Sequence, residues 1–186
     1  MLFLKGVATR SVSKYTLLIV WILVLIFTNV GFATQDLGVY VDRLEDPEKT
    51  DKCRYCGRHI KAGNIHKDAE RIIMNRLKEG LIEKGVGYVE GKERARYINV
   101  LIYRFEERRG GNFAAEKPAG VGFHMHLIED NNVIRVFVFD ETQQALSENV
   151  LNIGKFFRRG GKWLTAGELS EEGIKKGLDY LLENIY

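Results

Sequence analysis

Residues 121–139 read VGFHMHLIEDNNVIRVFVF, and this stretch decides the fold. Apolar residues recur at every second position of its first half, which is the periodicity of a β-strand. Asp130, Asn131 and Asn132 then supply side chains that tolerate the left-handed backbone of a tight turn. The stretch therefore predicts an antiparallel hairpin, with one strand over 121–128 and a returning strand over 133–139.

The sequence before the hairpin predicts a helix and two further strands. Residues 97–106 (YINVLIYRFE) are rich in β-branched and aromatic side chains and predict a long strand, and residues 86–89 predict a short one. Upstream, apolar residues at helical spacing predict an amphipathic helix that Asp68 begins and Gly85 ends. These residues are Ile72, Ile73, Leu77, Leu81 and Ile82.

The last third of the chain reads as helical. Ser147 is a candidate cap for a helix over 147–157, and Thr165 with Glu168 matches a capping box at the start of a final helix. The order of elements predicts an α+β fold, a mostly antiparallel sheet of about four strands with helices packed on one face.

The N-terminal segment carries an export signal or a membrane anchor. No residue from Tyr15 to Gln35 is charged, and a helix over 15–33 would be about 28 Å long, close to the hydrocarbon thickness of a bilayer. Lys5, Arg10 and Lys14 precede this run, which predicts a cytoplasmic N-terminus. Residues 1–33 are therefore either a cleaved signal peptide, with a small-x-small site ending at Ala33, or a retained transmembrane anchor. Both predict a periplasmic location for the remainder.

The net positive charge of the chain comes from this segment. Three of its 28 basic residues lie within residues 1–33, which hold no acid, so the other 25 balance the 25 acidic residues. A neutral body lacks the basic face that nucleic-acid binding requires, so no nucleic-acid partner is expected. Residues 34–66 are charged and show little periodicity, which predicts a polar linker ahead of an α+β domain over 67–186.

Cys53 and Cys56 form the sharpest local motif, Cys-Arg-Tyr-Cys-Gly, which resembles one knuckle of a zinc ribbon. A zinc ion needs further ligands, and the candidates nearby are His59 and His66. Two alternatives stay open: a Cys53–Cys56 disulfide formed in an oxidising periplasm, and a redox-active thiol pair. No cofactor is expected, and a zinc ion at this motif is the one candidate exception.

Two further groups of residues have weaker chemical significance. His124 and His126 lie on the same side of one strand, a geometry that some metal sites use, but a polar, half-exposed sheet face is the favoured interpretation. Two Arg-Arg-Gly-Gly loops are candidates for an anion- or partner-binding patch if they meet. Their basic residues are Arg108, Arg109, Arg158 and Arg159.

Nothing in the sequence predicts an enzyme. Asp140 and Glu141 stand at a strand end, where two carboxylates could act as acid and base, but no nucleophile accompanies them. The motifs of serine hydrolases, zinc proteases and kinases are absent from the sequence.

The closing stretch carries a family resemblance. Residues 139–163 read FDETQQALSENVLNIGKFFRRGGKW, and together with the predicted helix over 68–84, strand and hairpin they resemble uncharacterised exported proteins and lipoproteins of deltaproteobacteria. The arrangement is more distantly similar to the α/β domain of the LpoB, CsgG and TolB-amino-terminal group of envelope proteins. The resemblance implies action by protein–protein contact, without catalysis. The chain lacks the lipidated cysteine of the lipoprotein members.

Two functional hypotheses follow from these observations. The leading one is a non-enzymatic periplasmic domain that binds another envelope protein, as an assembly or accessory factor. The alternative is a zinc-binding or thiol-redox accessory protein that uses Cys53 and Cys56.

Overall fold

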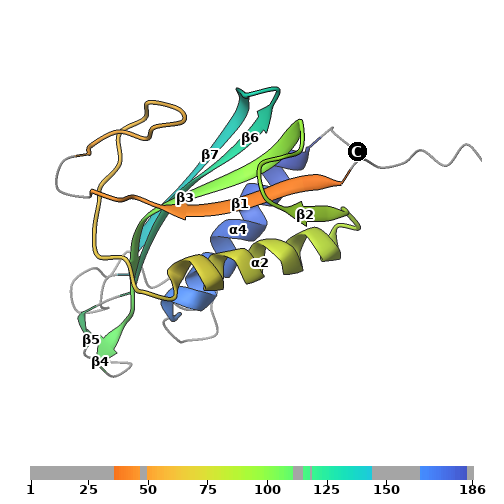
Figure 1. Cartoon of the computed structure of the whole chain (residues 1–186). Helices are drawn as coiled ribbons and strands as arrows, with labels where there is room; N and C mark the ends of the chain where they lie inside the picture. The colour runs from red at the N-terminus through yellow and green to blue at the C-terminus, as the bar shows by residue number, and fades with distance from the viewer. Residues whose placement is uncertain (1–35, 47–49, 111–114, 118, 144–163, 184–186) are drawn as a thin grey trace, which may run out of the picture. The chain divides into compact units, whose positions relative to one another are not determined.

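The computed structural model describes residues 36–46, 50–110, 115–117, 119–143 and 164–183 (Figure 1). All of them belong to one compact unit, Gln35–Tyr186. The predicted N-terminal segment and the predicted helix over 147–157 lie outside the described residues. The elements, in chain order, are β1 (Leu37–Arg43), α2 (Ala69–Glu83), β2 (Tyr88–Glu90), β3 (Arg96–Glu106), β4 (Arg109–Gly110), β5 (Ala115–Lys117), β6 (Gly120–Glu129), β7 (Asn132–Thr142) and α4 (Ala166–Leu182).

The main sheet has five strands in the order β2-β1-β3-β6-β7. Strand β1 pairs in parallel with both β2 and β3, whereas β3, β6 and β7 form antiparallel pairs. The α+β class and the hairpin at 121–139 are thus confirmed, with Asp130 and Asn131 at positive φ in its turn. The sheet differs from the prediction in being mixed, because β1 enters it as a fifth, parallel strand.

Strand β1 lies within the stretch that the charge pattern predicts as a linker. Its inward residues Leu37 and Val39 are at most 1% exposed, and α2 connects it to the parallel strand β2 in a β-α-β arrangement. Charges at Asp36, Asp42 and Arg43 flank or interrupt this short apolar run, so its composition resembles a linker. The charged residues lie at the strand ends, where each forms an ion pair, Asp36 with Arg94, Asp42 with Arg54 and Arg43 with Glu70.

Both helices cover the same face of the sheet, as Figure 1 shows. Helix α4 packs on β6, β7 and α2, while α2 packs on β1 and β3. The core between helices and sheet includes Val100, Phe123, Met125 and Leu127, all at most 1% exposed. Small residues of α4 face the hairpin and let the helix approach it closely, namely Ala166, Ser170, Gly173 and Gly177.

The helix boundaries follow the predicted signals except at the start of α2, where Asp68 occupies the N-cap position but its side chain makes no capping hydrogen bond. Thr165 and Glu168 form the capping box, in which each side chain bonds the other residue's backbone N–H. Helix α2 stops before Gly85, whose φ of +68° favours glycine. Ile82, which the sequence pattern places on the buried face, is 64% exposed. Neither helix in the described part of the chain is both long and apolar enough to cross a membrane.

The contact between α4 and the hairpin yields a stability prediction. A Cβ added at Gly173 would lie 2.7 Å from the ring of Phe139 and 2.8 Å from that of Phe123. We expect Gly173→Ala to lower the free energy of unfolding by about 1–3 kcal/mol through overpacking, despite the higher helix propensity of alanine. Urea denaturation measures the change.

Gly167→Ala is the matched control, because the nearest atom to its added Cβ is 3.8 Å away. This variant should be as stable as the wild type or more so. If Gly173→Ala matched its stability, the close approach of α4 to the sheet would be wrong.

Candidate metal centre

The Cys-x-x-Cys motif lies in the segment over 50–66, which crosses the sheet face opposite the helices. The backbone N–H of Cys53 donates to the carbonyl of Arg58, and the N–H of Gly57 donates to the carbonyl of Cys53, each over 2.8 Å. Gly57 has a φ of +68°, so glycine suits the residue that follows the second cysteine. Residues 53–58 therefore form a tight turn, called here the knuckle, that directs both thiols to one side.

The knuckle is held against the sheet by a second, smaller apolar cluster. Cys53 and Ile60 pack with Leu44, and with Leu101 and Tyr103 of β3. This packing buries a face of the sheet that the alternating pattern of 121–128 predicts to be half-exposed. His124 and His126 on that face are 0% exposed, so the expectation of a polar, solvated face is wrong.

Four potential ligands converge beneath the knuckle. The Sγ of Cys53 lies 3.3 Å from Nε2 of His126, and the Sγ of Cys56 lies 3.6 Å from Nδ1 of His124. All four ligand atoms lie within 4.8 Å of one another, and no other group of this kind occurs among the described residues. The sequence separations of 73 and 68 residues show that the fold alone assembles the cluster.

These distances fit a zinc ion. With Zn–S of about 2.3 Å and Zn–N of about 2.0–2.1 Å, tetrahedral geometry separates a sulfur ligand from a nitrogen ligand by about 3.6 Å. Two thiolates and two imidazoles are the donor set of many structural zinc sites, whereas calcium and magnesium select oxygen. The donor set and spacing therefore match zinc.

The lowered pKa values of the two histidines agree with this fit. Burial, with a smaller contribution from Arg58, lowers the pKa of His124 to about 4. Burial and the neighbouring His124 lower the pKa of His126 to about 4. Both imidazoles are neutral at neutral pH, which is the form that binds metal.

The thiol of Cys53 shows the opposite tendency. Burial raises its pKa to about 11, so without a cation it stays protonated and is a poor nucleophile. A redox-active pair needs a stabilised thiolate, and the backbone hydrogen bonds from Cys56 and Tyr55, which lower the pKa of Cys53, are outweighed by burial. A metal ion would stabilise the thiolate directly. The chemistry of the site thus favours metal binding over thiol redox catalysis.

The two histidines differ in the hydrogen bonding of the ring nitrogen that points away from the cysteines. Nδ1 of His126 lies 3.3 Å from Oδ1 of the fully buried Asn99, while Nε2 of His124 has no hydrogen-bond partner among the described residues. The ring of Tyr103 lies edge-on to that of His124, with centroids 5.2 Å apart. His126 is therefore the better oriented ligand.

The structure brings together only half of the ligand set predicted from sequence. Cys53 and Cys56 are in the cluster, but the side chain of His59 is 79% exposed and lies 3.6 Å from Asp51. His66 lies near the start of α2, where its Nδ1 accepts from the N–H of Asp68. Sequence proximity favoured these two residues, whereas the pairing of β6 with β3 supplies the actual neighbours.

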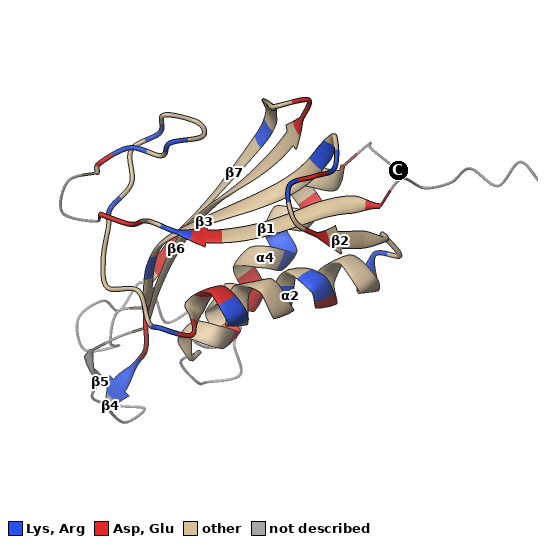
Figure 2. Cartoon of the chain, viewed as in Figure 1, with Lys and Arg blue, Asp and Glu red and all other residues tan. Residues whose placement is uncertain are grey.

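The arginine patch remains a prediction. Arg158 and Arg159 lie outside the described residues, Arg108 is half-buried and Arg109 is exposed at the start of β4. The carboxylate of Asp140, a candidate acid or base from the sequence, accepts hydrogen bonds from Arg104 and from the hydroxyl of Tyr103. These bonds join β7 to β3, which lie on either side of β6 in the sheet. Figure 2 shows basic and acidic residues interspersed along α2.

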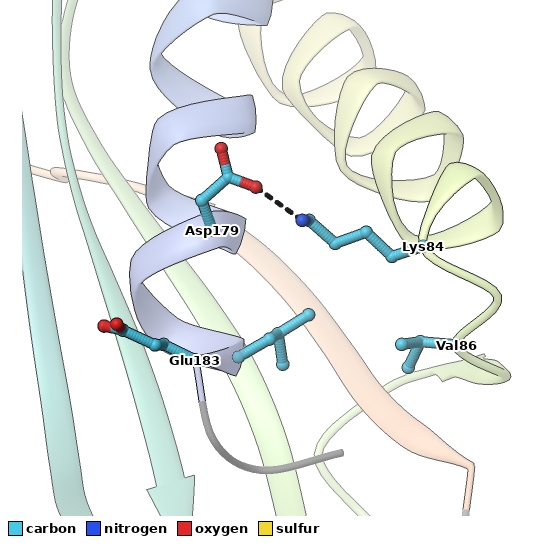
Figure 3. Close-up of a pocket in the computed structure, with 5 residues that line it drawn as sticks. Lys84, Val86, Asp179 and Glu183 are labelled. Atoms are coloured by element: carbon cyan, nitrogen blue, oxygen red, sulfur yellow. Dashed lines mark hydrogen bonds and ion pairs between the residues drawn. The ribbon is translucent and has the colours of Figure 1, made fainter.

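A cavity of about 300 Å³ lies between the end of α2 and α4, lined by Lys84, Val86, Asp179, Leu182 and Glu183. Lys84 and Asp179 form an ion pair at its wall, and their carboxylate and ammonium satisfy each other (Figure 3). Its carboxylates do not belong to a group of three or more side chains close enough to share a metal ion among the described residues, so the cluster beneath the knuckle is the stronger candidate site.

Comparison with known proteins identifies no family. No family model matches the chain, and no curated protein matches it. Among solved structures, it is similar to a PelC variant from Paraburkholderia phytofirmans that forms a dodecamer, with 13% identity, a TM-score of 0.48, and coverage of 80% of this chain and 90% of that one.

Two further likenesses are weaker. A Xanthomonas campestris protein of the DUF330 family has 10% identity and a TM-score of 0.42, with coverage of 83% of this chain and 86% of that one. A minor lipoprotein of Acinetobacter baumannii has 11% identity and a TM-score of 0.28, covering 80% and 91%. The chain is thus similar, at low identity, to structures that include a lipoprotein, and its function has to be argued from its own residues.

The position of the histidines gives a direct test of the ligand set. We expect His124→Ala and His126→Ala to lower the zinc content of the purified protein to well under one ion per chain, because each removes a ligand. His59→Ala and His66→Ala are the matched controls and should keep one ion. Metal analysis of the four variants decides, and zinc loss from the controls would contradict the assignment.

Proposed function

We propose that this protein is a zinc-binding, non-enzymatic domain of the cell envelope, in which the ion fixes the segment over 50–66 onto the sheet. The observation that carries the proposal is the convergence of Cys53, Cys56, His124 and His126 in one cluster, in which Cys56 is half-buried and the other three are buried. Buried polar groups without partners destabilise a fold, and a shared metal ion satisfies all four together.

The number of ligands supports a structural role over a catalytic one. Catalytic zinc sites keep a coordination position for water or substrate, whereas four protein ligands fill the tetrahedral shell. Three of the four candidate ligands, Cys53, His124 and His126, are also buried, and Cys56 is half-buried. The site is therefore proposed to stabilise a surface.

We propose that this surface acts by contact with another envelope protein, as the resemblance to the LpoB, CsgG and TolB-amino-terminal type of domain implies. Ile134 and Val138 on β7 are 50% and 37% exposed, and β7 forms an edge of the sheet. Exposed apolar residues on a sheet edge suit a protein partner.

Export is proposed from the charge asymmetry of residues 1–33, whether the segment is cleaved or retained in the inner membrane. A reporter enzyme that folds only in the periplasm, fused to the C-terminus, should be active in cells. Deleting residues 1–33 should abolish that activity. Equal activity of both fusions would contradict export.

Removal of the metal tests the structural role of the centre. We expect the purified, reduced protein to hold one zinc ion per chain, and a chelator to lower its thermal midpoint. At a free zinc concentration of about 1,000 times Kd the ion adds about 4.1 kcal/mol to the free energy of unfolding. Calorimetry with and without chelator measures the shift.

Hydrogen exchange then locates the effect. Amides over 50–66 should lose protection without zinc, whereas those of α4 and the hairpin keep theirs, because the core beneath the helices is separate. Recovery of the protein from cells with a complete Cys53–Cys56 disulfide and no metal would contradict the proposal and favour the disulfide alternative.

A further inference from the structure

A chain of buried and partly buried hydrogen bonds runs from β1 through the knuckle to the candidate metal centre. The hydroxyl of Tyr55, which stands between the two cysteines, donates to Oδ2 of Asp42 over 2.8 Å. Nδ2 of Asn99 donates to the oxygen of Tyr55 over 3.5 Å. Oδ1 of Asn99 lies 3.3 Å from Nδ1 of His126. The chain thus joins β1, the knuckle, β3 and β6.

The carboxylate at one end fixes the direction of every bond in the chain. A carboxylate only accepts, so the phenol of Tyr55 donates to Asp42 and offers its oxygen to the amide of Asn99. The amide NH₂ is used there, which leaves the carbonyl of Asn99 facing His126. A carbonyl also only accepts, so the proton of His126 resides on Nδ1 and the lone pair on Nε2.

A lone pair on Nε2 of His126 is what a metal site needs. Nε2 of His126 lies 3.3 Å from the Sγ of Cys53, on the side where an ion would sit. Metal-binding histidines commonly donate their other ring N–H to a protein oxygen, which fixes tautomer and ring orientation.

The knuckle also contacts the sheet through side chains that are not candidate ligands. Arg54 forms an ion pair with Asp42, and its guanidinium carbon lies 5.3 Å from the centre of the Tyr55 ring. The ring of Tyr55 in turn lies against that of His126, with centroids 5.1 Å apart. Two knuckle residues therefore contact β1 and β6 independently of the cysteines.

We propose that Asp42, Tyr55 and Asn99 are positioning residues of the metal centre, which hold the knuckle in place and present Nε2 of His126 to the ion. The inference rests on the proposed function, since it assigns the groups behind the zinc ligands. It implies that Nε2 of His126 already faces the site in the metal-free protein, whereas the knuckle is fixed fully only when zinc binds.

Substitution of Asn99 tests the proposal. We expect Asn99→Leu to weaken zinc binding by about 10–100-fold, the usual effect of removing a group behind a ligand. Asn99→Asp retains an acceptor for Nδ1–H and should stay close to the wild type. Tyr55→Phe should give an intermediate loss. Competition with a chromophoric chelator measures affinity in the reduced protein, and Asn132→Leu in the hairpin turn is the control.

A second readout separates positioning from general stability. In the reduced, metal-free wild type, nitrogen-15 NMR should show His126 as the Nδ1–H tautomer, and Asn99→Leu should show a mixture. The Nε2–H tautomer in the wild type, or unchanged zinc affinity in Asn99→Leu, would overturn the inference. If Asn99→Leu fails to fold, unchanged zinc affinity in Tyr55→Phe would overturn the inference. A wild type that binds no zinc would instead refute the proposed function, while the tautomer still tests the relay.

Discussion

The contact between the knuckle and the second face of the sheet is the constraint on which this structure depends. Helices α2 and α4 cover one face with apolar side chains, as in many α+β domains. The other face holds His124, His126 and Asn99, each 0% exposed, beneath two thiols. Burial of so many polar groups is unfavourable unless they bond one another or an ion. The hydrogen-bond chain from Asp42 satisfies part of this set, and a zinc ion would bind the thiols and the imidazole nitrogens that face them.

The sequence predicted the elements whose patterns are local. The hairpin, β3 and both described helices occur where periodicity and caps indicate them, since these signals act within a few residues. Strand β1 was not predicted, because it is short and lies between charged residues. Its stability comes from pairing with two strands that are distant in sequence. Its parallel pairing depends on the crossover through α2, which no local pattern in residues 34–66 reveals.

Half of the candidate site was also predictable. The spacing of Cys53 and Cys56 indicates a metal knuckle by itself, but the other two ligands come from a strand 68 to 73 residues away. Alternation in β6 suggested a solvated face for His124 and His126. A signal against this was present in β3, whose run from 97 to 103 is apolar at almost every position. Such a run indicates a strand buried on both faces, so its neighbour's histidines had to be buried too.

Zinc-edge X-ray absorption of the purified, reduced protein is the most direct test of this account. The account predicts a four-coordinate ion with two sulfur ligands at about 2.3 Å and two imidazole nitrogens at about 2.0–2.1 Å. The imidazole signal should be weaker in His126→Ala and unchanged in His59→Ala. A spectrum with oxygen ligands in place of the imidazoles, or the absence of bound zinc, would contradict the central claim that one ion joins the knuckle to the sheet.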